Sequence, residues 1–323
     1  MKREEEAEDL SPESKVFLLS LPKEKGWRTR YLYQYQGQWC QAKQTLAIVS
    51  FQKHFQAEAS DIMVATVPRS GTIWLKALVF AIVNRQRFGV SDDHHPLLTS
   101  DPHVLVASLD YKLYQNDILP DLSDFSRPRL FATHVAYPLL PESVKSSDCR
   151  IVHICRNPLD NFVSLWHLQV KLRPEALGPL SLEEAFDMYC RGAVPYGPYW
   201  EHMLGYWKMS LERPQKVFFV KYEDMKEDTI LHVKRLAEFV GFPFSVDEER
   251  EGVIEEISKL CSFQTLRKSE VNRPPEKATA NALMRKGEVG DWVNHLTPSM
   301  VDQLSNIMAE KLHGSGLTFK LSQ

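Results

Sequence analysis

The segment IMVATVPRSGTIWLKALVFAIV, residues 62–83, decides the fold of this chain of 323 residues. Its first residues are apolar and predict a buried strand from Ile62, and the apolar run from Leu75 predicts a helix. Between them lies the short loop VPRSG, which is rich in the residues that turns use. The segment therefore predicts one strand–loop–helix unit of an α/β protein with a largely parallel sheet.

This loop has the composition of an anion-binding site. Its backbone N–H groups and those of the first helical turn point the same way, and the helix dipole adds partial positive charge there. Gly71 lets the backbone approach an anion, and Arg69, Ser70 and Thr72 offer further donors. The nucleotide-triphosphate loop G-x-x-x-x-G-K-[ST] is a poor match, because its first glycine is missing and Pro68 stands early in the loop. The alternative interpretation is a turn whose polar residues only cap the helix.

The composition indicates a globular protein without a broad charged surface. Hydrophobic residues make up 43% of the chain, and 39 Lys and Arg nearly balance 42 Asp and Glu. The net charge of −3 therefore predicts neither nucleic acid nor a membrane surface as a partner. No apolar run has the length of a membrane span or a secretory leader, so we expect a cytosolic protein. The five cysteines form no C-x-x-C pair, and we interpret them as reduced structural thiols rather than metal ligands.

Apolar runs with strand character alternate with helical patterns along the chain. The strands are expected at residues 62–65, 129–134, 150–156 and 217–222, and helices at 161–170, 182–190, 229–240 and 247–260. This alternation predicts a single α/β domain, with a central, mostly parallel sheet flanked by helices and ligands beyond the carboxyl ends of the strands. The acidic residues 1–14 are typical of a flexible tail, so we expect the domain at residues 15–323.

Further basic residues stand at a strand end or in the long polar loop expected at residues 267–291. Arg156 ends the third strand, and Ser164 lies in the helix that follows. Arg285 and Lys286 precede a glycine in the polar loop, which suits a segment that closes over an anion. A ligand with two separate anionic groups would use all these sites. The simpler alternatives are an ion pair between Arg156 and Asp160, and a solvated basic loop.

His134 ends the second predicted strand, at the edge of the sheet where ligands are expected. A neutral imidazole at that edge can take a proton from a hydroxyl, because its pKa lies close to working pH. Most histidines are structural, and only this placement distinguishes His134 from the ten others.

Taken together, the motifs resemble those of the cytosolic sulfotransferases, and of their plant branch in particular. The matching stretches are LPKEKGW (21–27), VPRSGTIW (67–74, against P-K-S-G-T-T-W), TH (133–134), CRNPLDNFVSLWH (155–167), VKYEDMK (220–226), CSF (261–263) and MRKGEVGDW (284–292). The resemblance implies sulfuryl transfer from 3′-phosphoadenylyl sulfate (PAPS) to a hydroxyl of a small, largely apolar acceptor, such as a plant metabolite or hormone. It implies no metal.

The resemblance also assigns residues to three parts of the donor site. The phosphosulfate loop, which is similar to a P-loop, comprises Arg69, Ser70, Gly71, Thr72, Ile73 and Trp74. The 3′-phosphate site comprises Arg156, Ser164, Arg285, Lys286 and Gly287, and the adenine site Tyr222 and Phe263 beside Trp74. In this scheme His134 is the general base, and Arg69 stands at the position of the catalytic lysine.

Two positions depart from the family pattern. Arg69 replaces the lysine, and Ile73 replaces the second threonine. A guanidinium is larger and planar, so it meets the bridging oxygen of the donor less well than an ammonium group does. The alternative function is therefore a weak or silent member that binds PAPS, or its product 3′,5′-bisphosphate (PAP), with little turnover. A nucleotide kinase is a further rival, but its loop would need the missing glycine and lysine.

The acceptor and the oligomeric state are less defined. Aromatic residues expected to face the acceptor are Tyr31, Tyr33, Trp39, Tyr111, Tyr114, Tyr137 and Trp200. The run GWRTRYLYQYQGQWCQAKQ (26–44) most resembles the hydroxyjasmonate group, with flavonols, brassinosteroids and desulfoglucosinolates as alternatives. The dimer motif of animal relatives, K-x-x-x-T-V-x-x-x-E, is matched only at Thr297, so we expect a monomer.

Overall fold

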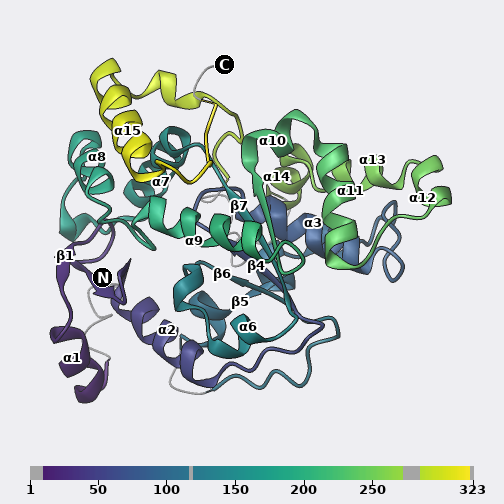
Figure 1. Cartoon of the computed structure of the whole chain (residues 1–323), viewed down its shortest axis with the longest axis horizontal. Helices are drawn as coiled ribbons and strands as arrows, with labels where there is room; N and C mark the ends of the chain where they lie inside the picture. Colours follow the sequence, from purple (N-terminus) through teal and green to yellow (C-terminus); the bar gives the residue numbers. More distant parts are fainter. Residues whose placement is uncertain (1–9, 116–118, 272–283, 321–323) are drawn as a thin grey trace.

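Five parallel strands form the central sheet of the protein, in the order β5–β6–β4–β7–β8 (Figure 1). The computed structural model describes residues 10–115, 119–271 and 284–320. The strands are β4 (Ile62–Thr66), β5 (Ala107–Ser108), β6 (Leu130–Thr133), β7 (Arg150–Cys155) and β8 (Val217–Lys221). The predicted fold class, an α/β domain around a parallel sheet, is confirmed.

The register of the sheet brings the ends of its strands together. Ala65 of β4 lies beside Thr133 of β6, and Thr66 lies beside Ile154 of β7. Cys155 in turn lies beside Lys221 of β8. Because all these strands run in the same direction, the loops that follow them leave from one edge of the sheet.

Helices cover both faces of the sheet (Figure 1). On one face, side chains such as Val64 and Val152 pack against α3 (Thr72–Asn84), α11 (Thr229–Val240) and α13 (Val253–Leu260). Alternate strand residues such as Met63 and Ile151 point to the other face, where the core includes residues of α2 (Ala42–His54) and α9 (Tyr199–Glu212). A neighbouring core joins α7 (Pro158–Leu172), α8 (Leu182–Cys190) and α15 (Pro298–Lys311).

A small antiparallel sheet lies before the central one in the chain. It consists of β1 (Lys23–Lys25), β2 (Tyr31–Tyr35) and β3 (Gln38–Cys40), preceded by α1 (Pro12–Leu19). The backbone of Trp39 continues the pairing, because its N–H donates to Gly197 O (2.9 Å) and its carbonyl accepts from Tyr196 N (2.6 Å). This sheet, which the sequence did not predict, therefore fixes the loop that carries Tyr196.

The remaining elements are short. They are α4 (Pro96–Thr99), α5 (Pro102–Leu105), α6 (Glu142–Ser146), α10 (Tyr222–Glu227), α12 (Val246–Arg250), α14 (Phe263–Val271), a π-helix η2 (Leu109–Leu113) and the 3₁₀-helices η3 (Tyr137–Leu139), η4 (Glu175–Leu177) and η7 (Asp291–Asn294). Within the described ranges, no helix has the length and apolar character needed to cross a membrane.

Three boundaries differ from those expected. The helix expected at 247–260 is divided at Gly252, whose φ of 78° is left-handed and ends the first part. Residues 267–271, expected in a loop, belong to α14, while residues 272–283 of that loop lie outside the described residues. Residues 12–14, expected in the tail, begin α1, where Ser11 caps the helix. The domain boundary at residue 15 stays a prediction.

Candidate active site

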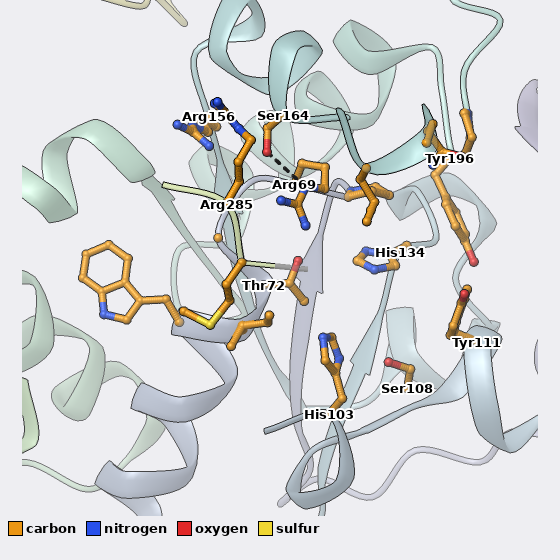
Figure 2. A pocket seen from close by; sticks show the side chains of 18 of the residues that line it. Arg69, Thr72, His103, Ser108, Tyr111, His134, Arg156, Ser164, Tyr196 and Arg285 are labelled. Carbon is orange, nitrogen blue, oxygen red and sulfur yellow. Dashed lines mark hydrogen bonds between the residues drawn. The ribbon is translucent and has the colours of Figure 1, made fainter. Parts of the chain in front are cut away.

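A cavity of about 450 Å³ lies at the edge of the sheet where the strands end (Figure 2). It is lined by every predicted site residue except Ser70: Arg69, Gly71, Thr72, Ile73, Trp74, His134, Arg156, Ser164, Tyr222, Phe263, Arg285, Lys286 and Gly287. These residues come from segments far apart in the sequence, and the parallel sheet brings them to one place.

The loop after β4 (residues 67–71) and the first turn of α3, which together we call the cradle, have the backbone conformation of an anion-binding site. Gly71 caps α3 with a φ of 108°, and Arg69 also takes a left-handed φ of 73°. A Cβ atom at Gly71 would lie 2.9 Å from Cδ2 of Tyr222, so a side chain is excluded by both strain and space. Thr72, Ile73 and Trp74 of the first turn of α3 line the cavity, and the N–H groups of a first helical turn have no partner within the helix, as a phosphate site needs.

Ser70 differs from the other residues of the loop because it faces the interior. Its side chain is fully buried, and its hydroxyl accepts from Asn161 Nδ2 (3.2 Å). The same Asn161 nitrogen donates to Pro68 O (2.9 Å), and Tyr189 Oη donates to Asn161 Oδ1 (3.2 Å). The hydroxyl of Ser70 thus braces the loop from behind and does not supply the expected donor to the cavity.

His134 follows β6 and presents one ring nitrogen to the cavity. Its Nδ1 lies 2.7 Å from the carbonyl oxygen of Thr66. A carbonyl oxygen only accepts, so Nδ1 carries the hydrogen and Nε2 carries a lone pair. Burial lowers the pKa of His134, with the charge of Asp110 acting in the opposite direction. The ring is therefore neutral at pH 7, with a basic nitrogen available.

The backbone of His134 is held as firmly as its ring. Its N–H donates to Asp110 Oδ1 (3.2 Å), and its carbonyl accepts from His202 Nε2 (2.9 Å). The ring centroid lies 5.2 Å from that of Tyr196, whose φ of 65° is unusual for a residue other than glycine. No local pattern predicted that His202 or Tyr196 approaches His134, because these contacts depend on long-range packing.

Three guanidinium groups gather on one side of the cavity (Figure 2). Arg69 Nε donates to Ser164 Oγ (3.0 Å). Burial lowers the pKa of Arg69 to about 10, and the positive charges of Arg156 and Arg285 add to this effect. Mutual repulsion among these cations would be relieved by a bound anion. The predicted basic residues therefore do meet, and their shared electrostatics suit an anionic ligand.

Arg156 and Tyr222 form the wall next to the cradle. The Arg156 guanidinium lies 4.7 Å from the centroid of the Tyr222 ring and donates to Glu288 O (2.5 Å). Tyr222 Oη donates to Gly287 O (2.8 Å). The rings of Tyr222 and Trp74 pack edge to face, with their centroids 5.5 Å apart. The expected ion pair of Arg156 with Asp160 is long, at 3.9 Å.

Two buried aspartates anchor residues 285–292, which we call the lid segment. Asp160 accepts from the N–H groups of Gly290 (2.7 Å) and Trp292 (3.1 Å). Lys286 Nζ donates to Asp291 Oδ1 (2.5 Å), and Arg285 Nη1 forms an ion pair with Asp291 Oδ2 (2.5 Å). Burial raises the pKa of the Asp291 carboxyl, but the contacts with Lys286 and Arg285 outweigh burial, so this pKa lies below the ordinary range. Both predicted lid cations are thus paired with Asp291 in this structure.

The acceptor half of the cavity differs from the aromatic wall expected from the sequence. Of the seven aromatic residues expected there, Tyr111 lines the cavity, and Arg28 Nη2 donates to its hydroxyl (3.0 Å). Tyr114, Tyr137 and Trp200 instead pack in the cores. The others, Tyr31, Tyr33 and Trp39, belong to the small antiparallel sheet. Lining residues that sequence reasoning missed include His103, Ser108, Lys112, Gln169 and Tyr196.

Comparisons with known proteins identify the family. The sulfotransferase domain family matches residues 59–316. The chain belongs to the sulfotransferase family. This sulfotransferase is 54% identical to cytosolic sulfotransferase 15 of Arabidopsis thaliana, over 98% of the chain and 90% of the relative, and 52% identical to cytosolic sulfotransferase 14, over 98% and 94%. The resemblance to the plant cytosolic branch is therefore confirmed.

Solved structures agree with this assignment. A putative steroid sulphotransferase of Arabidopsis thaliana has a TM-score of 0.78 at 42% identity and covers 97% of both chains. A mouse sulfotransferase complexed with PAP has a TM-score of 0.66 at 24% identity, covering 88% of this chain and 95% of that one. The second likeness concerns the fold alone. This chain is thus an enzyme of the sulfotransferase class.

Cysteines and metal ligands contribute little to the site of this sulfotransferase. All five cysteines are free, and Cys40, Cys149, Cys155 and Cys261 are buried. Burial raises the pKa of the Cys155 thiol well above its ordinary value, which keeps it protonated and unreactive. Within the part of the chain that the structure describes, no group of three or more His, Cys, Asp or Glu residues could hold a metal ion.

The Asp160 anchor leads to a prediction about the lid segment. Asp160→Ala should leave the amides of Gly290 and Trp292 without their acceptor, and their hydrogen exchange should quicken at least about tenfold. The exposed Asp247, on α12, provides the control Asp247→Ala. Mass spectrometry of peptides that cover the lid segment would measure the change. Equal exchange in both variants would show that other contacts hold the lid.

Proposed function

We propose that this sulfotransferase transfers the sulfuryl group of PAPS to a hydroxyl of a small acceptor, with His134 as general base. The observation that carries the proposal is the neutral Nε2 of His134, which faces a cavity that also holds the cradle and three guanidinium groups. In the reaction, a bond forms between the acceptor oxygen and sulfur, and the bond from sulfur to the bridging phosphate oxygen breaks. The hydroxyl proton moves to His134, and PAP leaves.

The donor fits the distribution of positive charge in the cavity. The cradle at Gly71 and Thr72 would take the 5′-phosphosulfate through backbone N–H groups. Arg156 and Ser164 would bind the 3′-phosphate. Arg285 and Lys286 would also contact this phosphate, either while they stay paired with Asp291 or after they leave that carboxylate. The rings of Trp74, Tyr222 and Phe263 would hold adenine. A donor with two anionic groups uses all these parts, whereas ATP lacks the 3′-phosphate.

Transfer then depends on position and on charge. His134 is held through its ring by Thr66 and through its backbone by Asp110, so its lone pair keeps one direction. Arg69 and the N–H groups of the cradle would stabilise the negative charge that moves onto the bridging oxygen of the departing nucleotide. These steps are supported by the chain's own residues and need no metal.

Arg69 and Ile73 support a second candidate function, a weak or silent protein that binds PAPS or PAP. The Arg69 guanidinium reaches Ser164, and Ile73 packs partly against the core instead of offering a hydroxyl. Calorimetry with PAP beside a transfer assay separates the candidates. PAP binding without transfer to any acceptor would favour the silent protein, and stronger binding of ATP would favour a kinase.

The acceptor and the setting complete the proposal. The names of the Arabidopsis relatives support a cytosolic location. We propose a monomer that acts on a small plant metabolite or hormone. A screen across flavonols, hydroxyjasmonates, brassinosteroids and desulfoglucosinolates with labelled PAPS would identify the acceptor class.

The role of His134 is tested by His134→Gln. Glutamine keeps a polar side chain but cannot take the proton, so kcat should fall by about 10²–10⁴-fold. PAP affinity, measured by calorimetry, should change less than about threefold. His94→Gln, at an exposed histidine outside the cavity, is the matched control. Retention of full kcat in His134→Gln would contradict the proposed base.

The pH profile provides a separate test. Burial lowers the pKa of His134 below its ordinary value of 6.5, and only the neutral ring acts as a base. We therefore expect kcat/KM to stay level as the pH falls from about 8 to 6.5, and to decline about tenfold per pH unit below the lowered pKa. This decline should be absent from the residual rate of His134→Gln. A decline that begins above pH 6.5 would argue against the neutral base.

The two departures from the family pattern are tested together. Arg69→Lys with Ile73→Thr should raise kcat about tenfold, because an ammonium group and a hydroxyl then meet the transferred group. Arg235→Lys, at an exposed position on α11, controls for the general effect of the exchange. An unchanged kcat with a good acceptor would show that these positions do not limit turnover.

A further inference from the structure

Lys76 is a buried cation without a role in the proposed transfer. It lies on α3, one turn beyond the cradle, and its side chain is fully buried. Its Nζ contacts His103 Nδ1 (3.0 Å), Val106 O (2.9 Å) and Ser108 Oγ (3.0 Å). A lysine is rarely buried so completely unless a specific set of partners holds it.

The position of Lys76 is electrostatically costly. Burial lowers its pKa to about 7, and the charges of Asp110 and Asp101 act in the opposite direction. The ammonium form has three hydrogens, one for each of its three partners, and so it satisfies them all as a donor. In that form the Nδ1 atom of His103 is an acceptor.

His103 joins this buried group to the cavity. Its ring lines the cavity, and Figure 2 shows it pointing toward Thr72 and His134. Burial and the positive charge of Lys76 hold the pKa of His103 well below its ordinary value, so the ring is neutral. A neutral ring with an accepting Nδ1 carries its hydrogen on Nε2. When Lys76 is in its ammonium form, the cavity therefore contains a donor imidazole that points toward Thr72 and the basic imidazole of His134.

We propose that His103 is a specificity-determining residue, whose Nε2–H donates a hydrogen bond to a second oxygen of the acceptor molecule. Lys76 acts as a positioning residue that fixes the tautomer. The favoured acceptor class is a hydroxy compound that also has a carbonyl, carboxylate, ether or second hydroxyl oxygen. This inference rests on the proposed transfer, because it places the reacting hydroxyl at His134.

Isosteric probe pairs test the proposal. Methyl 4-hydroxybenzoate is compared with 4-sec-butylphenol, and methyl 5-hydroxypentanoate with 5-methylheptan-1-ol, as substrates and as ligands of the PAP-bound enzyme. We expect the wild type to prefer the ester of at least one pair by about tenfold in KM or Kd. His103→Leu should abolish this preference, because KM or Kd for the ester rises, while PAP affinity changes less than about twofold. His103→Gln, which keeps an N–H donor, should restore part of it.

The tautomer of His103 can be tested separately by ¹⁵N NMR spectroscopy. The ¹⁵N spectrum of the wild type at about pH 6 should show the hydrogen of His103 on Nε2, and Lys76→Met should remove this bias and reduce the ester preference. His94→Leu is the control for an exposed histidine, and thermal melting checks that each variant folds.

The outcomes separate the two proposals. No ester preference in the wild type, including failure to bind any probe, or an equal preference in His103→Leu, overturns the inference about His103. An ester preference in binding without sulfuryl transfer to any hydroxyl would instead overturn the proposed function. A purely structural role of Lys76 and His103 predicts lower melting temperatures with unchanged preference.

Discussion

The pairing of β4 with β6 on one side and β7 on the other is the constraint on which the site depends. It aligns Thr66 with the ends of both neighbours, so the cradle, His134 and Arg156 leave the sheet side by side. Parallel strands must be joined by long crossovers, and here these place α3 and α7 beside the same cavity. The order of the strands therefore brings residues 69, 134 and 156 together in one site.

At the ends of these strands, the positive charges of Arg69, Arg156 and Arg285 lie close together, and nearby carboxylates balance them only in part. Asp160 and Asp291 are two buried acids near the guanidinium groups, and both also contact the lid segment. Their carboxylates thereby connect the electrostatics of the proposed anion site to the conformation of the lid segment. Repulsion among Arg69, Arg156 and Arg285 lowers the stability of the free form, and binding of an anion offsets that cost.

The local patterns in the sequence predicted the elements whose stability is local. The helices expected at 182–190 and 229–240 have those bounds, because their amphipathic periods and capping residues Ser181 and Asp228 define them. The two-residue β5 and the small antiparallel sheet were missed, since they depend on long-range pairing. For the same reason, sequence reasoning placed the cavity residues but missed the inward turn of Ser70 and the approach of His103.

The shorter of two contacts at Nδ1 of the His134 ring is with the main-chain carbonyl of Thr66 (2.7 Å), the other being with the Thr66 hydroxyl (3.1 Å), and this has an evolutionary consequence. Substitution at residue 66 changes the side chain but leaves that carbonyl in place, provided that β4 keeps its path. Such a substitution removes the hydroxyl contact, but the carbonyl still orients the imidazole. Residues 28, 103 and 111 in the surrounding walls make their contacts through side chains, so substitutions there change the acceptor half of the cavity directly. A fold built in this way permits new substrate preferences to arise while the chemical step is inherited unchanged.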